Sequence, residues 1–168
     1  MKGHPMHLPI CLTALLFAAS LSVHAAPAAP GAVEVKSIAE VEVEVVNYKG
    51  KKELKRQPVE KAVPGTEVIY TTTFKNLIAK PVGNIAITNP VPNDTVYKGG
   101  SAVGTNTDIT FSVDGGKTWG TPDKLKLKGK DGKERIALPA EMTHIRWTYR
   151  GELPVGKTGE ISFRAAIK

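Results

Sequence analysis

The sequence has little cysteine, little histidine and few aromatic residues. Its 168 residues include one cysteine, four histidines and two tryptophans. Cys11, His4, His7 and His24 all fall within about the first 25 residues, so His144 is the one histidine after them. If that segment is removed, disulfide bonds, zinc–thiolate centres and cysteine nucleophiles are excluded from the remaining chain. We therefore expect neither a metal site nor a cofactor.

Residues 1–25 have the order of a cleavable signal peptide. Lys2 gives a positive start, a mostly apolar stretch runs from Ile10 to Val23, and Ala25 completes a cleavage site with small residues. The apolar stretch is about 14 residues long, whereas a membrane-spanning helix needs roughly 20. We expect a helical signal peptide that is removed on export, the alternative being an uncleaved anchor or a buried helix.

The chain after the signal peptide is expected to be a single domain. Residues 26–32 are rich in proline and alanine and predict a short extended tether, which leaves residues 33–168 for the domain. A chain of this length can build a core without disulfides. No second apolar stretch is long enough to span a membrane, so we expect a periplasmic or cell-surface location in a bacterium.

Alternation of apolar and polar residues dominates residues 33–168. From Val33 to Val45 the odd positions are mostly apolar and the even positions mostly glutamate, which predicts a half-buried antiparallel strand. Similar alternation predicts strands at Glu67–Asn76, Val82–Asn89, Asp108–Val113, Thr143–Tyr149 and Gly159–Ile167. About seven to nine strands with frequent turns predict an all-β fold, an immunoglobulin-like antiparallel β-sandwich. A closed barrel is the alternative.

Three segments carry a resemblance to a known family. They are VPGTEVIYTTTFKN at 63–76, GNIAITNPVP at 83–92 and YKGGSA at 97–102. Over residues of about 63–168 the chain resembles the bacterial conserved-repeat domain family of unknown function, an immunoglobulin-like module of exported and cell-surface proteins. Asn89 stands where that family more often has aspartate, and Val91 where it has leucine. The resemblance implies a fold and an extracytoplasmic setting, and it brings no catalytic residues.

One motif resembles the Asp-box hairpins of sialidases and related propellers. Ser112, Asp114, Gly116, Thr118 and Trp119 fit the pattern Ser-x-Asp-x-Gly-x-Thr-Trp. A propeller needs several blades of roughly 40–50 residues each, and this chain has one copy of the motif. We interpret it as a structural hairpin in which the aspartate bonds backbone amides across the turn. The alternative is a carbohydrate-active hydrolase that uses this region.

Other candidate catalytic residues stand alone in the sequence. His144 is out of phase with the apolar residues of its predicted strand, so we interpret it as a surface residue. Nothing in the spacing indicates a serine and a carboxylate that would complete a triad with it. Asp94, Asp108, Asp114 and Glu141 are candidate carboxylates for glycoside hydrolysis only as isolated residues. We expect a protein that is not an enzyme.

Positive charge gathers at two places in a chain whose formal net charge is +7. The first cluster is Lys49, Lys51, Lys52, Lys55 and Arg56, and the second is Lys124, Lys126, Lys128 and Lys130. Lysines can protect an exposed strand edge from pairing. They can also attract an anionic surface, such as lipopolysaccharide phosphate or an acidic glycan. We expect no nucleic-acid partner, because no basic platform interleaved with aromatic residues is present.

These observations predict a non-enzymatic exported β-sandwich module with a structural or binding role at the bacterial cell envelope. Its expected partner is an envelope protein, an anionic glycan or lipopolysaccharide. Besides the hydrolase, an assembly subunit that pairs through strand edges is an alternative, and both a monomer and an oligomer are compatible with the sequence.

Overall fold

The computed structural model describes residues 31–61 and 63–168, and this part of the chain is all-β, as the alternation predicts. Its one helical element is a short 3₁₀ helix, η1 (Pro139–Glu141). No helix of the described residues is long and apolar enough to cross a membrane. The predicted signal peptide and most of the predicted tether lie outside the described residues. Ala32, at the end of the tether, is buried, and its carbonyl accepts a hydrogen bond from Leu77.

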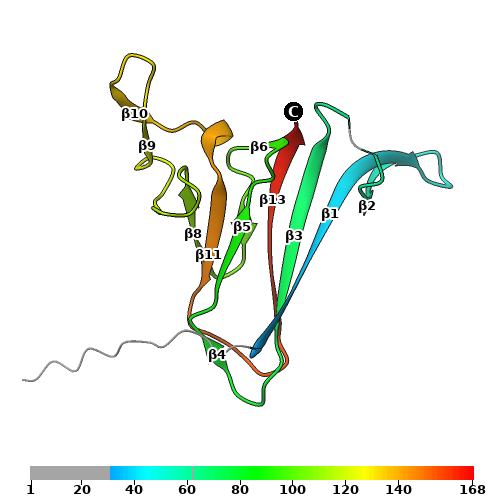
Figure 1. Ribbon diagram of the computed structural model, residues 1–168. Coiled ribbons are helices and arrows are strands. Elements are labelled where there is room, and N and C mark those ends of the chain that lie inside the picture. Colours follow the sequence, from blue (N-terminus) through cyan, green and yellow to red (C-terminus); the bar gives the residue numbers. More distant parts are fainter. Residues whose placement is uncertain (1–30, 62) are drawn as a thin grey trace, which may run out of the picture.

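The larger of two facing sheets has six antiparallel strands (Figure 1). Its order is β2 (Lys52–Pro58), β1 (Val33–Val46), β3 (Glu67–Asn76), β13 (Thr158–Ile167) and β6 (Thr95–Tyr97), and β7 (Val103–Gly104) also pairs with β13. The central strand β3 has the bounds that its alternation predicts. The strands that flank β3 come from the two ends of the described chain, so the sheet forms only when distant segments meet.

The smaller sheet has three antiparallel strands in the order β5 (Ala86–Pro90), β11 (His144–Tyr149) and β8 (Thr107–Ser112). Two short pairs complete the fold: β4 (Val82–Gly83) with β12 (Glu152–Leu153), and β9 (Lys126–Lys128) with β10 (Glu134–Ile136). The described residues thus contain thirteen strands rather than seven to nine, because segments of only two or three residues also pair.

The core lies between the two sheets and is built around aromatic rings. Trp147 of β11 faces Phe163 of β13 at a centroid distance of 6.2 Å, and Tyr97 of β6 faces Phe111 of β8 at 5.5 Å. The side-chain amide of Asn89 also crosses between the sheets and donates to the Thr72 hydroxyl. Two packed antiparallel sheets with inward-facing residues form a β-sandwich.

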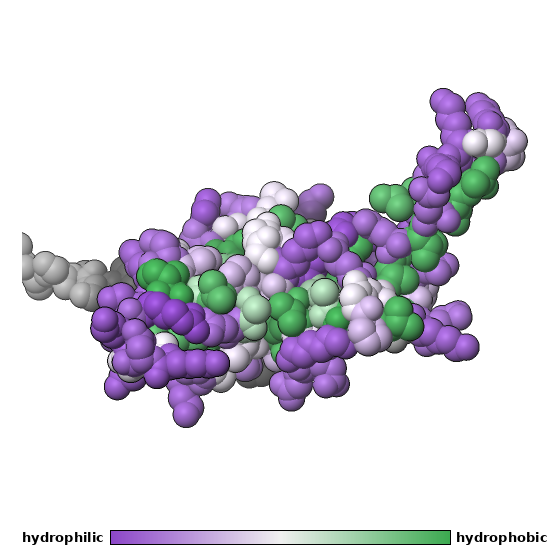
Figure 2. All heavy atoms as spheres, turned by 90° about the horizontal axis from the view of Figure 1, so that it is seen from above, coloured by the Kyte–Doolittle hydropathy of each residue, from purple (hydrophilic) through white to green (hydrophobic). Residues whose placement is uncertain are grey.

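Most of β1 and all of β2 lie outside the core, against which Val33 packs at the start of β1. β1 pairs with β3 as far as Val41, and its remainder pairs only with β2. Residues 42–58 therefore form a projecting hairpin, the β1–β2 arm, which Figure 2 shows as a narrow extension with apolar as well as polar surface. All seven residues of β2 are exposed, and Leu54 has 67% of its surface accessible.

Two predicted strands differ from the structure. The strand expected at Val82–Asn89 is divided into β4 and β5, since Asn84 has a φ of 54°, in the left-handed region that interrupts an extended chain. Lys124, Lys126 and Lys128 alternate with Leu125 and Leu127, which predicts one strand from residue 124, but the strand begins at Lys126. Leu125 just before it is buried, and its carbonyl accepts a hydrogen bond from Ala137, which fixes the base of the β9–β10 hairpin.

Candidate functional site

The Asp-box residues form a tight hairpin directly after β8. Asp114 Oδ1 accepts hydrogen bonds from the backbone N–H groups of Lys117 (3.1 Å) and Thr118 (2.9 Å), and Oδ2 accepts from the Thr118 hydroxyl. The Ser112 hydroxyl lies 2.7 Å from Oδ1. Bonds from Thr118 and Ser112 hold the pKa of Asp114 well below its usual range. The carboxylate is therefore ionised and committed to the turn.

Trp119 at the end of this hairpin packs against side chains of β11. The guanidinium carbon of Arg146 lies 3.8 Å from the centroid of the Trp119 ring, and the His144 ring meets Trp119 edge-on at 6.4 Å. Arg146 Nε also donates to the Thr88 hydroxyl at 3.2 Å. His144, expected on the less buried face, is half-buried. The hairpin thus places an aromatic ring, an arginine and a histidine on the outer face of the smaller sheet.

A groove of about 440 Å³ begins beside this cluster. His144 and Gly115 line it at the Asp-box hairpin, and Asn93, Thr95 and Lys168 line it farther along. Glu141 also lines it, together with several apolar residues. A separate apolar cavity of about 270 Å³ lies near Tyr97 and Phe111. The groove is the more polar of the two, so it suits a ligand that forms hydrogen bonds.

Of the four candidate carboxylates, Asp94 is exposed in the turn before β6, and the other three bind different partners. Asp108 pairs with Arg150 at 2.6 Å, and Glu141 pairs with Arg135 at 2.5 Å. Hydrogen bonds from Arg135 and from the backbone of Leu138 lower the pKa of Glu141 to about 2. In the part of the chain that the structure describes, no three His, Cys, Asp or Glu residues are grouped so that they could hold a metal ion.

The first basic cluster lies on the β1–β2 arm. Lys52 pairs with Glu44 at 2.7 Å and Arg56 with Glu42 at 3.4 Å, both across the hairpin. The other lysines of the cluster, Lys49, Lys51 and Lys55, are exposed, and Lys49 Nζ lies 5.4 Å from the centroid of the Tyr48 ring. The arm therefore carries excess positive charge into solvent.

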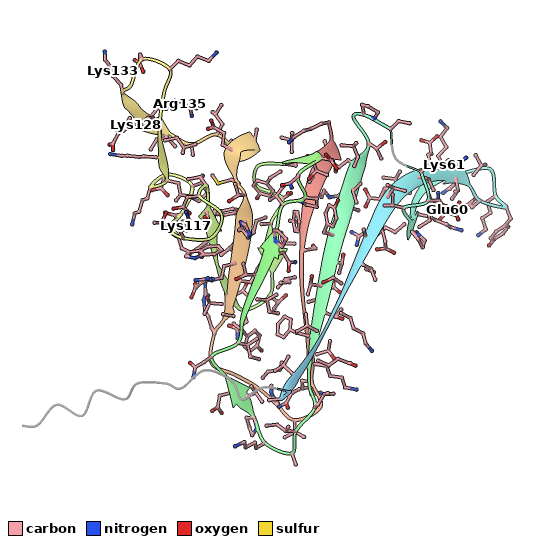
Figure 3. The ribbon with its side chains drawn as sticks, viewed as in Figure 1. Glu60, Lys61, Lys117, Lys128, Lys133 and Arg135 are labelled. Carbon is pink, nitrogen blue, oxygen red and sulfur yellow. The ribbon has the colours of Figure 1, made fainter. Side chains whose placement is uncertain are left out.

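The second basic cluster lies on the β9–β10 hairpin. Lys124 precedes β9, Lys126 and Lys128 are its ends, and Lys130 is in the turn. Lys126 pairs with Glu134 at 3.3 Å. Figure 3 shows Lys128 and Lys133 on this hairpin and Lys117 on the same side of the molecule. Together they form a second surface of exposed cations.

The fold brings both clusters to one end of the molecule. In Figure 1 the β9–β10 hairpin and the β1–β2 arm project on opposite sides of the end where β13 and the chain terminate, while β1 begins at the other end. The groove is lined by Lys168 and by residues next to β6 and η1, so it opens at this same end. Neither the shared end nor the contact of Arg146 with Trp119 is visible in the sequence, where these residues are far apart.

No family model matches the sequence, and no curated protein matches it.

Proposed function

We propose that this protein is an exported, non-enzymatic β-sandwich module that binds an anionic component of the bacterial cell envelope. The observation that carries the proposal is the placement of two basic hairpins at one end of the sandwich. Each hairpin has lysines, such as Lys55 and Lys128, that form no ion pair with a carboxylate of the described residues. Cations that project from two sides of one end can contact a negatively charged surface at two points, which strengthens attachment.

The secretory pattern of residues 1–25 and the resemblance over residues of about 63–168 support the remaining parts of the proposal. The first suggests export to the periplasm or cell surface. The resemblance to the conserved-repeat family suggests an immunoglobulin-like arrangement of strands. Two packed antiparallel sheets are compatible with that arrangement. Asp114, the acidic centre of the hydrolase alternative, is fully engaged in its turn. That engagement favours a binding role for this region.

Assembly through strand edges has less support. β2 is the exposed outer strand of the larger sheet, but it carries Lys52, Lys55 and Arg56 and ends at Pro58. Two copies pairing there would bring like charges together, and proline removes a donor from the ladder. The edge is better suited to remaining free.

Cosedimentation with purified lipopolysaccharide at low and high salt tests the proposal. We expect binding at about 50 mM NaCl that weakens strongly at about 500 mM, since salt screens exposed charges. Lys51→Glu/Lys55→Glu on the arm and Lys128→Glu/Lys130→Glu on the other hairpin should each weaken binding about tenfold. The matched control is Lys80→Glu/Lys157→Glu, which makes the same charge change on exposed lysines near the opposite end.

Binding that survives both hairpin variants contradicts the proposal. So does an equal loss in the Lys80/Lys157 control, because that result would reflect net charge rather than the two hairpins. Absence of binding at low salt also rejects lipopolysaccharide as the partner.

A further inference from the structure

We propose that Arg146, held on the Trp119 ring, binds a carboxylate of an acidic oligosaccharide that continues into the groove beside His144. This inference rests on the proposed function, because it specifies one ligand class for the same anion-binding module. It adds a defined site on the outer face of the smaller sheet, separate from the lysines of the two hairpins.

Arg146 differs from every other arginine of the described residues. Arg56, Arg135, Arg150 and Arg164 each form an ion pair with a carboxylate. The guanidinium of Arg146 pairs with no carboxylate in this part of the chain. Its Nε bonds the Thr88 hydroxyl, and the bonds of the described residues leave both terminal nitrogens available.

The geometry holds this guanidinium ready for a planar anion. Stacking at 3.8 Å on Trp119 and the 3.2 Å bond to Thr88 fix the side chain from two directions. The two free nitrogens present parallel N–H donors, the arrangement that binds a carboxylate through both of its oxygens. Because the arginine is already ordered, a ligand loses little of its binding free energy to fixing it.

The surroundings favour a sugar as the carrier of the anion. Thr88 and Thr110 lie opposite Arg146 on the two neighbouring strands, so hydroxyl groups flank the guanidinium. The nearest acidic residues on this face are already engaged, Asp108 by Arg150 and Asp114 by its own turn. On this face of the sheet a hydroxyl-rich anion therefore finds donors and acceptors beside carboxylates that already have partners.

The groove gives the oligosaccharide a path away from Arg146. His144 lies two residues before Arg146 on the same face of β11 and also lines the groove. Beyond it, the groove is lined by Asn93, Thr95 and Lys168, whose Nζ donates to the Asn93 carbonyl. Glu141 also lines it, with its carboxylate paired to Arg135. These polar groups suit sugar hydroxyls better than an acyl chain, whose apolar surface would leave them unpaired.

Titration with a tetramer of galacturonic acid, followed by tryptophan fluorescence and calorimetry, tests the site. Trp119 is partly exposed and contacts Arg146, whereas Trp147 is 1% exposed in the core, so binding should change the signal of Trp119. Arg146→Gln should weaken binding at least tenfold. Lys157→Gln, which removes one positive charge from an exposed residue just before β13, should weaken it less than twofold.

Two further comparisons separate geometry from charge and one ligand class from another. Arg146→Lys keeps the positive charge but loses the planar pair of N–H donors, so it should still weaken binding at least threefold. The thermal unfolding midpoint of this variant reports whether its fold is intact. Maltotetraose, which is neutral, and inorganic polyphosphate should bind at least tenfold more weakly than the uronate. Stronger binding of polyphosphate would overturn the glycan assignment.

Equal losses in Arg146→Gln and Lys157→Gln, or full binding by Arg146→Gln, would reject the site. If lipopolysaccharide binding still depends on the two hairpins in that case, the proposed function stands and only this inference fails. If wild-type protein binds the uronate through Arg146 but ignores lipopolysaccharide, the hairpin proposal fails and the site remains.

Discussion

Two neighbouring threonines of β3 face opposite sides of the larger sheet and have opposite hydrogen-bond status. Thr71 Oγ1 is buried and has no hydrogen-bond partner among the described residues. Thr72 Oγ1 lies 2.8 Å from the Ser37 hydroxyl and accepts from Asn89 at 2.9 Å. Because an unpaired buried hydroxyl costs free energy, Thr71→Val should raise the free energy of unfolding by about 1 kcal/mol.

Thr72→Val serves as the matched control, since it has the same change of shape on the adjacent residue. It leaves the Asn89 amide without its partner between the sheets, so it should lower the free energy of unfolding by about 1–3 kcal/mol. Urea unfolding of the two variants measures both values. Similar destabilisation by both variants would show that the unpaired Thr71 hydroxyl does not reduce the free energy of unfolding.

Gly159 of β13 lies against the ring of Phe74. A Cβ on this residue would overlap the ring of Phe74, which is buried in the core opposite it. Gly159→Ala should therefore lower the free energy of unfolding by about 1–3 kcal/mol through overpacking. Gly83→Ala is the control, because its nearest neighbour would be Glu152 Cγ at 3.5 Å. Equal urea midpoints for the two variants would contradict the prediction.

At the scale of elements, an ion-pair network fixes the base of the β1–β2 arm. Both terminal nitrogens of Arg164 on β13 bond Glu42 of β1 at 3.0 Å, and one also bonds Glu67 of β3 at 2.8 Å. Lys98 bonds the other oxygen of Glu67. Arg164 lowers the pKa of Glu42, and Lys98 together with Arg164 lowers that of Glu67. Four segments are thereby joined on one face of the sheet.

This network predicts a dependence of stability on pH. Since the folded state lowers the pKa of Glu42 and of Glu67 below that of an unfolded glutamate, their stabilisation is complete above the unfolded pKa. It is lost as pH falls through the folded pKa values, where both carboxylates become protonated. Glu42→Gln should therefore be less stable than wild type at pH 7, and the difference should narrow towards pH 3.

Urea unfolding at several pH values measures this difference. Glu60→Gln, a change in an exposed loop residue, should match wild type throughout. A constant gap between Glu42→Gln and wild type from pH 7 to pH 3 would show that Glu42 contributes by packing rather than by charge.

Alternation in the sequence located the long elements and failed at their interruptions. β3 has its predicted bounds, and β1, β8, β11 and β13 differ from prediction by a residue at one or both ends. The pattern could not foresee the positive φ of Asn84, because asparagine also occurs in extended strands. It also gave no sign that the inner face of β1 is left uncovered, since that depends on the width of the opposite sheet.

In the candidate site too, features formed by neighbouring residues could be predicted and contacts between distant residues could not. The Asp-box residues are contiguous, so the sequence identified their hairpin. Arg146 was missed, although it alternates with His144 on the polar face of a predicted strand. Its partner Trp119 is 27 positions earlier in the printed sequence, and no local pattern indicates that the two stack.

At the scale of the whole molecule, aromatic contacts across the core lead us to expect that the two sheets unfold as one cooperative unit. Trp147 contacts Phe163 across the interface and donates from Nε1 to the carbonyl of Val103. In Trp119→Phe, the one remaining tryptophan reports the core. Its fluorescence and the far-ultraviolet circular dichroism should therefore give the same urea midpoint. Midpoints that differ beyond experimental error would show that the sheets unfold separately.

The exposed tip of the β1–β2 arm is a site where a protease should cut the chain. Lys49, Lys51 and Lys52 lie at or beside the turn, where trypsin should cut first. β1 would then be a separate peptide that lies between β2 and β3 and is still bonded to both. We expect the cut pieces to elute together on gel filtration. When urea destabilises the sheet, an added synthetic peptide with the β1 sequence should exchange with the bound β1 fragment. The cleaved protein should therefore behave as a pair of complementing fragments.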